Sequence, residues 1–323
     1  MNNRVTIGLL MLTKNSRSTV QAALNSASPY MSQMVVVDTG SEDDTVQIAI
    51  RSGAEVYFFN WIDDFSAARN FALKHIHTDW VLMLDSDEVL SFFDIEIFYQ
   101  LIDKINIGGI NILIDNMLER EGNFTTSSHR YTRLFKRDDS FFFTGKIHEQ
   151  IRNSIEAGGF EIIESDFKIL HMGYQNFDKQ KNERNTRLLQ IDSSENPEDD
   201  WLKLHLAETH FTAGRIIEAE GLLNEILYSK MLSVKQKELA KLRLAQISLG
   251  NDNYQESINL TEFSSDDFQN EALRLYVRGT SFLFMKKYEE SIHLLEKCLA
   301  VDSPSLVQSD VRRVLELAKK LFN

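Results

Sequence analysis

The segment Trp80-Val81-Leu82-Met83-Leu84-Asp85-Ser86-Asp87-Glu88 decides the fold of the first half of this chain. Its five apolar residues are typical of a β-strand that is buried on both faces, as in a parallel sheet. Three acids follow within four positions, and carboxylates this close repel one another unless positive charge lies between them. A divalent metal that carries a diphosphate would supply that charge. The alternative is an acidic turn that caps the next helix.

Strand and helix signals alternate before this segment. We expect buried strands at residues 5–12 and 34–37 and a short strand at 55–59. Helices are expected to start after Ser18, around Ile48 and at residue 65, the last one running to residue 76. Such short repeated units indicate a parallel α/β sheet, in which functional groups gather at the carboxyl ends of the strands.

A second acid follows the strand at 34–37, in the segment Asp38-Thr39-Gly40-Ser41. In one interpretation the Asp38 carboxylate accepts hydrogen bonds from a nucleotide base or a ribose. In the other, Asp38 and Ser41 cap the turn that leads into the next helix, which the Gly40-Ser41 pair explains equally well. The segment alone does not decide between them.

From about Asn196 onward, strand signals disappear and apolar residues recur at helical spacing. Helix pairs are expected over residues 202–226, with a turn at Gly214, and over 239–263 and 272–299. Pairs of about 34 residues are typical of tetratricopeptide repeats, and a plain helical bundle is the alternative. We therefore predict an α/β domain at residues 1–192 and an all-α domain at residues 193–323.

Composition narrows the class of protein. The chain has 323 residues and a formal net charge of −13, without a basic run, which argues against nucleic acid as a partner. The single cysteine, Cys298, excludes an intramolecular disulfide and fits a reducing compartment. The apolar run at 5–12 is too short for a membrane span or a typical signal peptide, so we expect a cytoplasmic protein.

Four short motifs follow one another at the ends of the expected elements: Thr13-Lys14-Asn15, Asp38-Thr39-Gly40-Ser41, Ala68-Arg69-Asn70 and Asp85-Ser86-Asp87. Over residues 4–190 this series resembles the family 2 inverting glycosyltransferases, which have the GT-A (Rossmann-like) fold. The resemblance implies that Asp38 faces the nucleotide base, that Arg69 braces the nucleotide, and that Asp87 ligates Mn²⁺ or Mg²⁺. The residues that it implies for the nucleotide-sugar site are Thr13, Asn15, Asp38, Gly40, Arg69, Asp85 and Ser86.

Three later segments extend the resemblance: Arg133-Leu134-Phe135-Lys136, Gly145-Lys146-Ile147-His148-Glu149-Gln150 and Leu170-His171-Met172-Gly173-Tyr174. They are similar to a bacterial subgroup that includes lipopolysaccharide-core glucosyltransferases and the enzymes that glycosylate bacteriocin peptides, some of which carry tetratricopeptide-like extensions. An inverting transfer needs a base that deprotonates the acceptor. We favour Glu149 as this base, with His148 as the open alternative. His171 is a candidate metal ligand, because neutral imidazole binds Mn²⁺.

The sequence thus predicts metal-dependent transfer of a hexose or N-acetylhexosamine from a UDP-sugar to a peptide or saccharide acceptor. The repeats would hold the acceptor or join copies of the chain. A sugar nucleotidyltransferase is less well supported, because the loop at residues 13–18 lacks the glycines expected of that class. A non-catalytic nucleotide-binding scaffold with protein-binding repeats is the alternative from another class.

Overall fold

The chain divides into two compact units, residues 1–182 and 183–323. The computed structural model describes residues 5–104, 106–120, 123–171, 179–301, 303 and 308–322, so residues 172–174 of the last quoted motif lie outside the described part. Each unit encloses its own apolar core. The predicted domain boundary, between residues 192 and 193, falls inside helix α6 (Lys179–Glu195).

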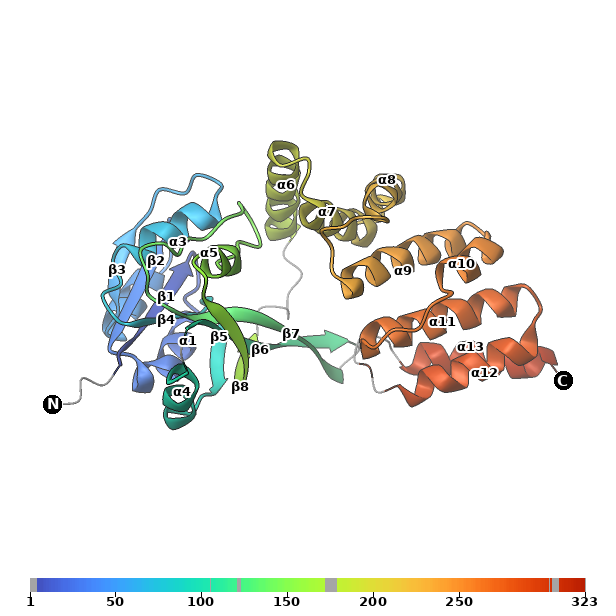
Figure 1. The fold of residues 1–323 in the computed structure, drawn as a ribbon, viewed down its shortest axis with the longest axis horizontal. Helices are drawn as coiled ribbons and strands as arrows, with labels where there is room; N and C mark the ends of the chain where they lie inside the picture. Colours follow the sequence, from blue (N-terminus) through green and yellow to red (C-terminus); the bar gives the residue numbers. More distant parts are fainter. Residues whose placement is uncertain are drawn as a thin grey trace. The chain divides into compact units, whose positions relative to one another are not determined.

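The first unit is built on one eight-stranded sheet with the strand order β3-β2-β1-β4-β7-β6-β8-β5 (Figure 1). Its strands are β1 (Ile7–Thr13), β2 (Gln33–Asp38), β3 (Glu55–Phe58), β4 (Trp80–Met83), β5 (Glu88–Phe92), β6 (Ile107–Arg120), β7 (Asn123–Lys136) and β8 (Glu161–His171). The expected strands in the first 84 residues are all present, each within about two residues of its predicted bounds.

The expected parallel arrangement is confirmed for the four predicted strands, but the sheet as a whole is mixed, because strands after β4 that were not predicted join it in antiparallel pairs. Strands β1 to β4 are parallel to one another, but β7 runs antiparallel to both β4 and β6, and β5 runs antiparallel to β8. A parallel pair needs a crossover connection of a dozen residues or more. Only residues 121 and 122 separate β6 from β7, so these two strands pair as neighbours in the antiparallel sense.

Helices cover both faces of this sheet. Those of the first unit are α1 (Val20–Ala27), α2 (Thr45–Arg51), α3 (Phe65–Leu73), α4 (Ile95–Ile102) and α5 (Arg152–Ala157), with a 3₁₀ turn at Ser28–Tyr30. Helices α1, α2 and α4 pack on one face, and α3 and α5 pack on the other (Figure 1). Successive side chains of β1 point to opposite faces of the sheet, so that Leu9 packs in the core on the first face and Leu10 in the core on the second. Two predicted helix bounds shift: α1 begins at Val20, and α3 ends at Leu73.

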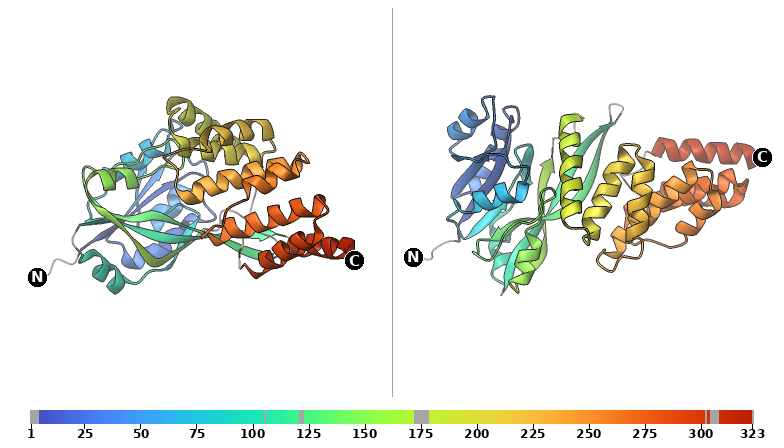
Figure 2. Two further views of the ribbon diagram at one scale, coloured as in Figure 1. Left: turned by 45° about the vertical axis from the view of Figure 1, so that its right-hand side comes forward. Right: turned by 90° about the horizontal axis from the view of Figure 1, so that it is seen from above.

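The second unit is all-α in the part that the structure describes. Its helices after α6 are α7 (Asp200–Thr212), α8 (Ile216–Ile226), α9 (Val234–Gly250), α10 (Tyr254–Leu260), α11 (Phe268–Phe284), α12 (Tyr288–Ala300) and α13 (Gln308–Phe322). Helices α7 with α8, α9 with α10, and α11 with α12 form the three predicted pairs, which follow one another in space (Figure 2). Gly214 has a φ of +75°, so a residue that tolerates left-handed backbone makes the first turn. No helix among the described residues is long and apolar enough to cross a membrane.

Candidate active site

The loops that follow β1 and β2 are tied together at the carboxyl edge of the sheet. Thr13 and Asp38 are paired in register, and the backbone N–H of Thr39 donates to the Thr13 carbonyl at 3.0 Å. Asn15 binds the second loop in both directions, since its N–H donates to Ser41 Oγ at 2.9 Å and its Oδ1 accepts from Glu42 N at 2.8 Å. The Ser86 hydroxyl joins the same loops, because it lies 2.8 Å from Ser16 Oγ. Five of the predicted nucleotide residues thus lie at this edge or in its loops: Thr13, Asn15, Asp38, Gly40 and Ser86.

Asp38 holds the turn that follows it. One carboxylate oxygen accepts from Gly40 N at 3.0 Å and Ser41 N at 2.9 Å, and the other accepts from Ser41 Oγ at 2.5 Å. Gly40 has a φ of +107°, which a side chain would strain. These contacts are the ones expected of the turn-capping interpretation. A carboxylate has about four acceptor positions, so the three contacts leave capacity for a ligand.

The acidic segment after β4 closes on itself as a turn. The backbone N–H of Glu88 donates to the Asp85 carbonyl at 3.0 Å, and the Asp85 N–H donates to Glu88 Oε2 at 2.9 Å. The Glu88 side chain is 1% exposed, whereas that of Asp85 is 36% exposed. The alternative reading of an acidic helix cap is therefore wrong, because β5 follows this turn and not a helix.

Two buried arginines bind the carboxylates around this turn. Arg69, on α3, contacts Asp85 Oδ1 through Nη2 at 2.5 Å and Glu149 Oε1 through Nε at 2.8 Å. Arg133, on β7, contacts Asp85 Oδ2 at 3.2 Å and Glu88 Oε1 at 2.8 Å through Nη2. The positive charge that the clustered acids require is thus supplied, for these three carboxylates, by the protein itself.

The charges shift the titration of the acids in opposite directions. Burial alone would raise the pKa of Asp85, but the guanidinium groups of Arg69 and Arg133 outweigh it and hold this pKa well below its ordinary value. Burial raises the pKa of Glu88 to about 7, with the charge of Asp85 acting in the same direction and Arg133 opposing it. Asp85 is therefore a permanent anion, held between two cations.

Asp87 has a different neighbour, His171 at the end of β8. The two residues approach to 3.4 Å between Asp87 Oδ2 and His171 Nε2, and the other ring nitrogen, Nδ1, contacts Asn116 Oδ1 at 2.9 Å. Burial lowers the pKa of His171, but Asp87 and the charges of Glu88 and Asp85 prevail and raise it. This point in the site therefore favours positive charge. The two predicted metal ligands meet here, and no cluster of three or more His, Cys, Asp or Glu side chains suited to a metal occurs in the described part of the chain.

The loop with His148 and Glu149 is fastened to α3. Asn70 makes two hydrogen bonds with the backbone of Phe143, at 2.9 and 2.8 Å, and the Phe65 N–H donates to the Lys146 carbonyl at 2.9 Å. Thr144 and Gln150 pair across the loop by two backbone hydrogen bonds. The motif Ala68-Arg69-Asn70 thus has two tasks, because Arg69 holds Glu149 and Asn70 holds the loop from which Glu149 projects.

His148 and Glu149 differ in their surroundings. Glu149 is 11% exposed, and among the described residues its Oε2 accepts no hydrogen bond. His148 is exposed and has a φ of +54°. Desolvation of its ring lowers the pKa of His148, with the charge of Glu149 opposing, so the imidazole is neutral at pH 7.

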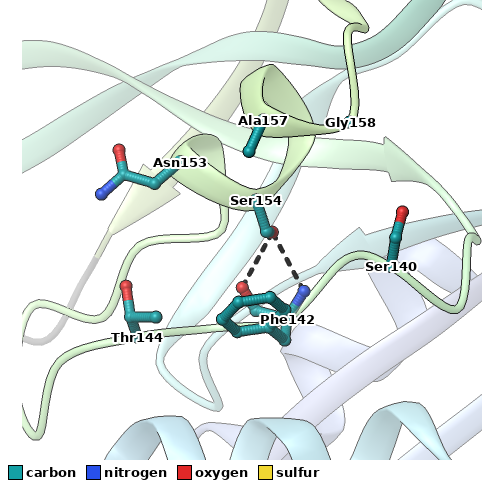
Figure 3. Close-up of a pocket in the computed structure, with 7 residues that line it drawn as sticks. All are labelled: Ser140, Phe142, Thr144, Asn153, Ser154, Ala157 and Gly158. Carbon is teal, nitrogen blue, oxygen red and sulfur yellow. Dashed lines mark hydrogen bonds between the residues drawn. The ribbon is translucent and has the colours of Figure 1, made fainter.

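A shallow depression of about 310 Å³ lies beside the same loop but apart from these residues (Figure 3). Ser154 spans its floor with two hydrogen bonds to the backbone of Phe142, at 3.0 and 2.9 Å. No predicted site residue lines it; its lining residues are Ser140, Phe142, Thr144, Asn153, Ser154, Ala157 and Gly158. The two hydrogen bonds of Ser154 hold α5 to the backbone of Phe142.

Three contacts of this site were not predicted from the sequence: those of Glu88, Arg133 and Asn116. Arg133 was noted only as part of a motif, and its position opposite the acidic turn follows from the antiparallel pairing of β7 with β4. Asn116 has no motif of its own, and only the register that sets it beside His171 shows its contact.

Comparison with known proteins identifies the first unit. Residues 9–166 match the family described as "Glycosyl transferase family 2". A TPR repeat-containing protein of Synechococcus elongatus is 29% identical over 151 residues, which are 47% of this chain and 36% of that protein. The SPbeta prophage-derived glycosyltransferase SunS of Bacillus subtilis is 26% identical over 212 residues, 64% of this chain and 49% of SunS. The chain thus spans half or less of the length of these curated relatives.

Among solved structures, the mannosyltransferase PcManGT from Pyrobaculum calidifontis, in complex with GDP-Man and Mn²⁺, is 14% identical with a TM-score of 0.48. It covers 80% of this chain and 85% of its own. The segment from residue 9 to residue 166 is a family 2 glycosyltransferase domain, and the helical region after it fits tetratricopeptide-like repeats. The expected family is confirmed for residues 9–166, and the expected order of an α/β unit followed by an all-α region is confirmed for the described residues.

The ion pairs give a prediction for stability. Replacing Arg133 by Met leaves the buried Glu88 carboxylate without its cation, and we expect the free energy of unfolding of the first unit to fall by about 3–5 kcal/mol. The double variant Arg133→Met/Glu88→Gln should recover a substantial part of this loss, because the two effects are coupled. Urea unfolding followed by tryptophan fluorescence in a Trp201→Phe background measures this free energy. The remaining tryptophans, Trp61 and Trp80, both lie in the first unit.

The matched control is Arg137→Met, which removes a pair with the 96%-exposed Asp139 at 3.6 Å. We expect this change to shift stability by less than about 1 kcal/mol. Equal losses in the two single variants would show that the buried pair has no special weight.

Proposed function

We propose that this chain transfers a hexose or an N-acetylhexosamine, with inversion, from a UDP-sugar to a peptide or saccharide acceptor, and that it uses Mn²⁺ or Mg²⁺. The observation that carries the proposal is the Asp87–His171 pair, because the neighbouring acids of the same turn, Asp85 and Glu88, are already balanced by arginines. The family of the first unit supports the reaction class, and the name of SunS supports it independently.

The donor atoms fit a divalent ion. Two ligand atoms that each lie about 2.1 Å from one ion are at most about 4.2 Å apart, and Asp87 Oδ2 and His171 Nε2 are 3.4 Å apart. Mg²⁺ in particular is commonly held by one or two protein ligands together with substrate phosphates. The charges that raise the pKa of His171 favour a metal cation at the same point. When bound, the ion would neutralise the departing diphosphate.

The nucleotide would occupy the edge between the β1 and β2 loops. Thr13 Oγ1 is buried there without a hydrogen-bond partner among the described residues, and so is Arg69 Nη1. Buried polar atoms of this kind are costly unless a ligand satisfies them. We propose that Thr13, Asn15, Asp38 and Gly40 line the nucleoside site and that Arg69, Asp85 and Ser86 support the sugar diphosphate.

Glu149 is the proposed base. Arg69 holds its Oε1 atom, so the carboxylate has a fixed orientation and Oε2 is the oxygen that takes the proton from the acceptor nucleophile. His148, neutral and exposed on the same loop, would contact the acceptor. Both residues would thus face the acceptor from the loop that Asn70 holds in place.

The repeats would bind the acceptor or a second copy of the chain. Stacked helix pairs present extended binding surfaces, and the Synechococcus relative is named for such repeats. The second unit has its own core, so it can carry a binding task that is separate from the chemistry.

The first test of the proposal is the release of UDP from a panel of UDP-sugars in the presence of Mn²⁺. We expect slow hydrolysis of one donor that EDTA abolishes. Asp87→Asn should slow it by about 100-fold or more, since a catalytic metal supplies several kcal/mol. Asp139→Asn, at an exposed position, is the control and should keep the wild-type rate. If the folded protein shows neither turnover nor Mn²⁺-dependent stabilisation by UDP, the transferase proposal is wrong and the scaffold interpretation replaces it.

The base is tested by kcat for transfer to an acceptor. Glu149→Gln should lower kcat by about 10²–10⁴-fold with little change in the KM for the donor, because a general base acts in the chemical step. Glu156→Gln, on the exposed surface of α5, is the matched control. A larger loss of kcat in His148→Ala than in Glu149→Gln would exchange the roles of the two residues.

The role of the repeats is tested by deleting the chain from Pro197 onward, which leaves α6 complete. Donor hydrolysis should persist, whereas transfer to peptide or oligosaccharide acceptors should be lost. Full acceptor turnover by the folded, shortened chain would remove the second unit from acceptor binding.

A further inference from the structure

The contact between His171 and Asn116 has a consequence for how the site binds metal. Asn116 lies on β6 and is 8% exposed, and the sheet pairs it directly with His171 on β8. Its Oδ1 atom is 2.9 Å from His171 Nδ1. Because a carbonyl oxygen only accepts hydrogen bonds, Nδ1 must carry a proton.

The opposite end of the same amide is also engaged. Asn116 Nδ2 lies 3.2 Å from Nδ1 of His129 on β7, and an amide NH₂ group only donates. The two contacts together hold the amide between the rings of His171 and His129. In this arrangement Asn116 Oδ1 accepts from the Nδ1–H of His171, and Nε2 of the same ring faces Asp87, which is the geometry that a metal bound at Nε2 requires.

The burial of Asn116 makes the pairing of its side-chain amide a requirement. A buried amide is costly unless both of its ends are paired, and an apolar residue would fill the same place in the sheet without that requirement. Asn116 instead connects the end of β8 with β7 through two histidines. Ligating histidines in metalloproteins generally donate their second ring N–H to an oxygen, which fixes the ring and its tautomer.

We infer that Asn116 is a positioning residue that fixes His171 as a metal ligand through Nε2, opposite Asp87. The inference rests on the proposed function, because it concerns the divalent ion of that site. Asn116 itself does not touch the ion or the substrate. Its contribution is to hold the ring with Nε2 facing Asp87 before the metal arrives, so that binding replaces the proton at Nε2 and does not require reorientation of the ring.

The test compares Mn²⁺ affinity in the presence of UDP across variants of the full chain, measured from the electron paramagnetic resonance signal of free Mn²⁺. Asn116→Ala should weaken Mn²⁺ binding by about 10–100-fold, the usual effect of losing such a partner. Asn116→Asp keeps an acceptor oxygen for His171 Nδ1–H and should stay within about threefold of the wild type. The ¹⁴N coupling of bound Mn²⁺ reports the imidazole directly, and it should persist in Asn116→Asp and fall in Asn116→Ala, as in His171→Ala.

The matched control is Asn111→Ala. Asn111 is a second buried asparagine on β6, 5% exposed, with partners at both ends of its amide in Thr132 and Glu164. Its loss should lower the melting temperature by a similar amount and leave Mn²⁺ affinity and the ¹⁴N coupling unchanged.

The outcomes separate the inference from the function. If the wild type binds Mn²⁺ with UDP but Asn116→Ala binds it equally well, the positioning role is wrong and the proposed function stands. The same conclusion follows if Asn111→Ala or Asn116→Asp loses as much affinity as Asn116→Ala. If the folded wild type binds no Mn²⁺ with UDP, the metal-dependent function fails and the inference fails with it.

Discussion

The guanidinium group of Arg69 joins parts of the chain that are far apart in sequence. It is 3% exposed, and it binds Asp85 at the end of β4 and Glu149 in the loop after β7. A buried cation is tolerated only when anions surround it, so its position on α3 determines where both carboxylates lie. The neighbouring Asn70 holds the backbone of the same loop, and Asp64 caps the helix that presents both residues. The proposed base and the acidic turn therefore share one rigid support.

The site also separates two kinds of negative charge. Asp85, Glu88 and Glu149 are compensated by Arg69 and Arg133, whereas Asp87 faces a histidine whose pKa is raised. An external cation placed among the first three would have to compete with Arg69 and Arg133 for the same carboxylates. At Asp87 and His171 a cation has only to replace the proton of an imidazole. In the proposed function, the arginines would thus direct the divalent ion to one end of the acidic turn.

The sequence predicted the parts of this site that depend on strand ends. A buried strand followed by acids, at Trp80 to Glu88, located the carboxyl edge correctly, because apolar runs and their ends are local properties of a sequence. The antiparallel half of the sheet was missed, since β6, β7 and β8 are long strands whose pairing depends on contacts between residues up to about 60 positions apart. Arg133 and Asn116 lie on those strands, and their partners are set by register, which periodicity does not reveal. His171 was found because it ends an apolar run, as Asp38 and Asp85 do.

The three acids were, by themselves, an ambiguous signal for a metal site. Three carboxylates in four residues imply that positive charge is nearby, but an arginine from a distant strand satisfies that requirement as well as an ion does. Two of the three acids proved to be paired in this way. What distinguishes Asp87 is a neighbour, His171, that is itself a proposed metal ligand and whose ring contacts a buried amide. A metal site in such a domain is therefore better recognised by the residues that orient the ligands than by the density of acidic residues in the sequence.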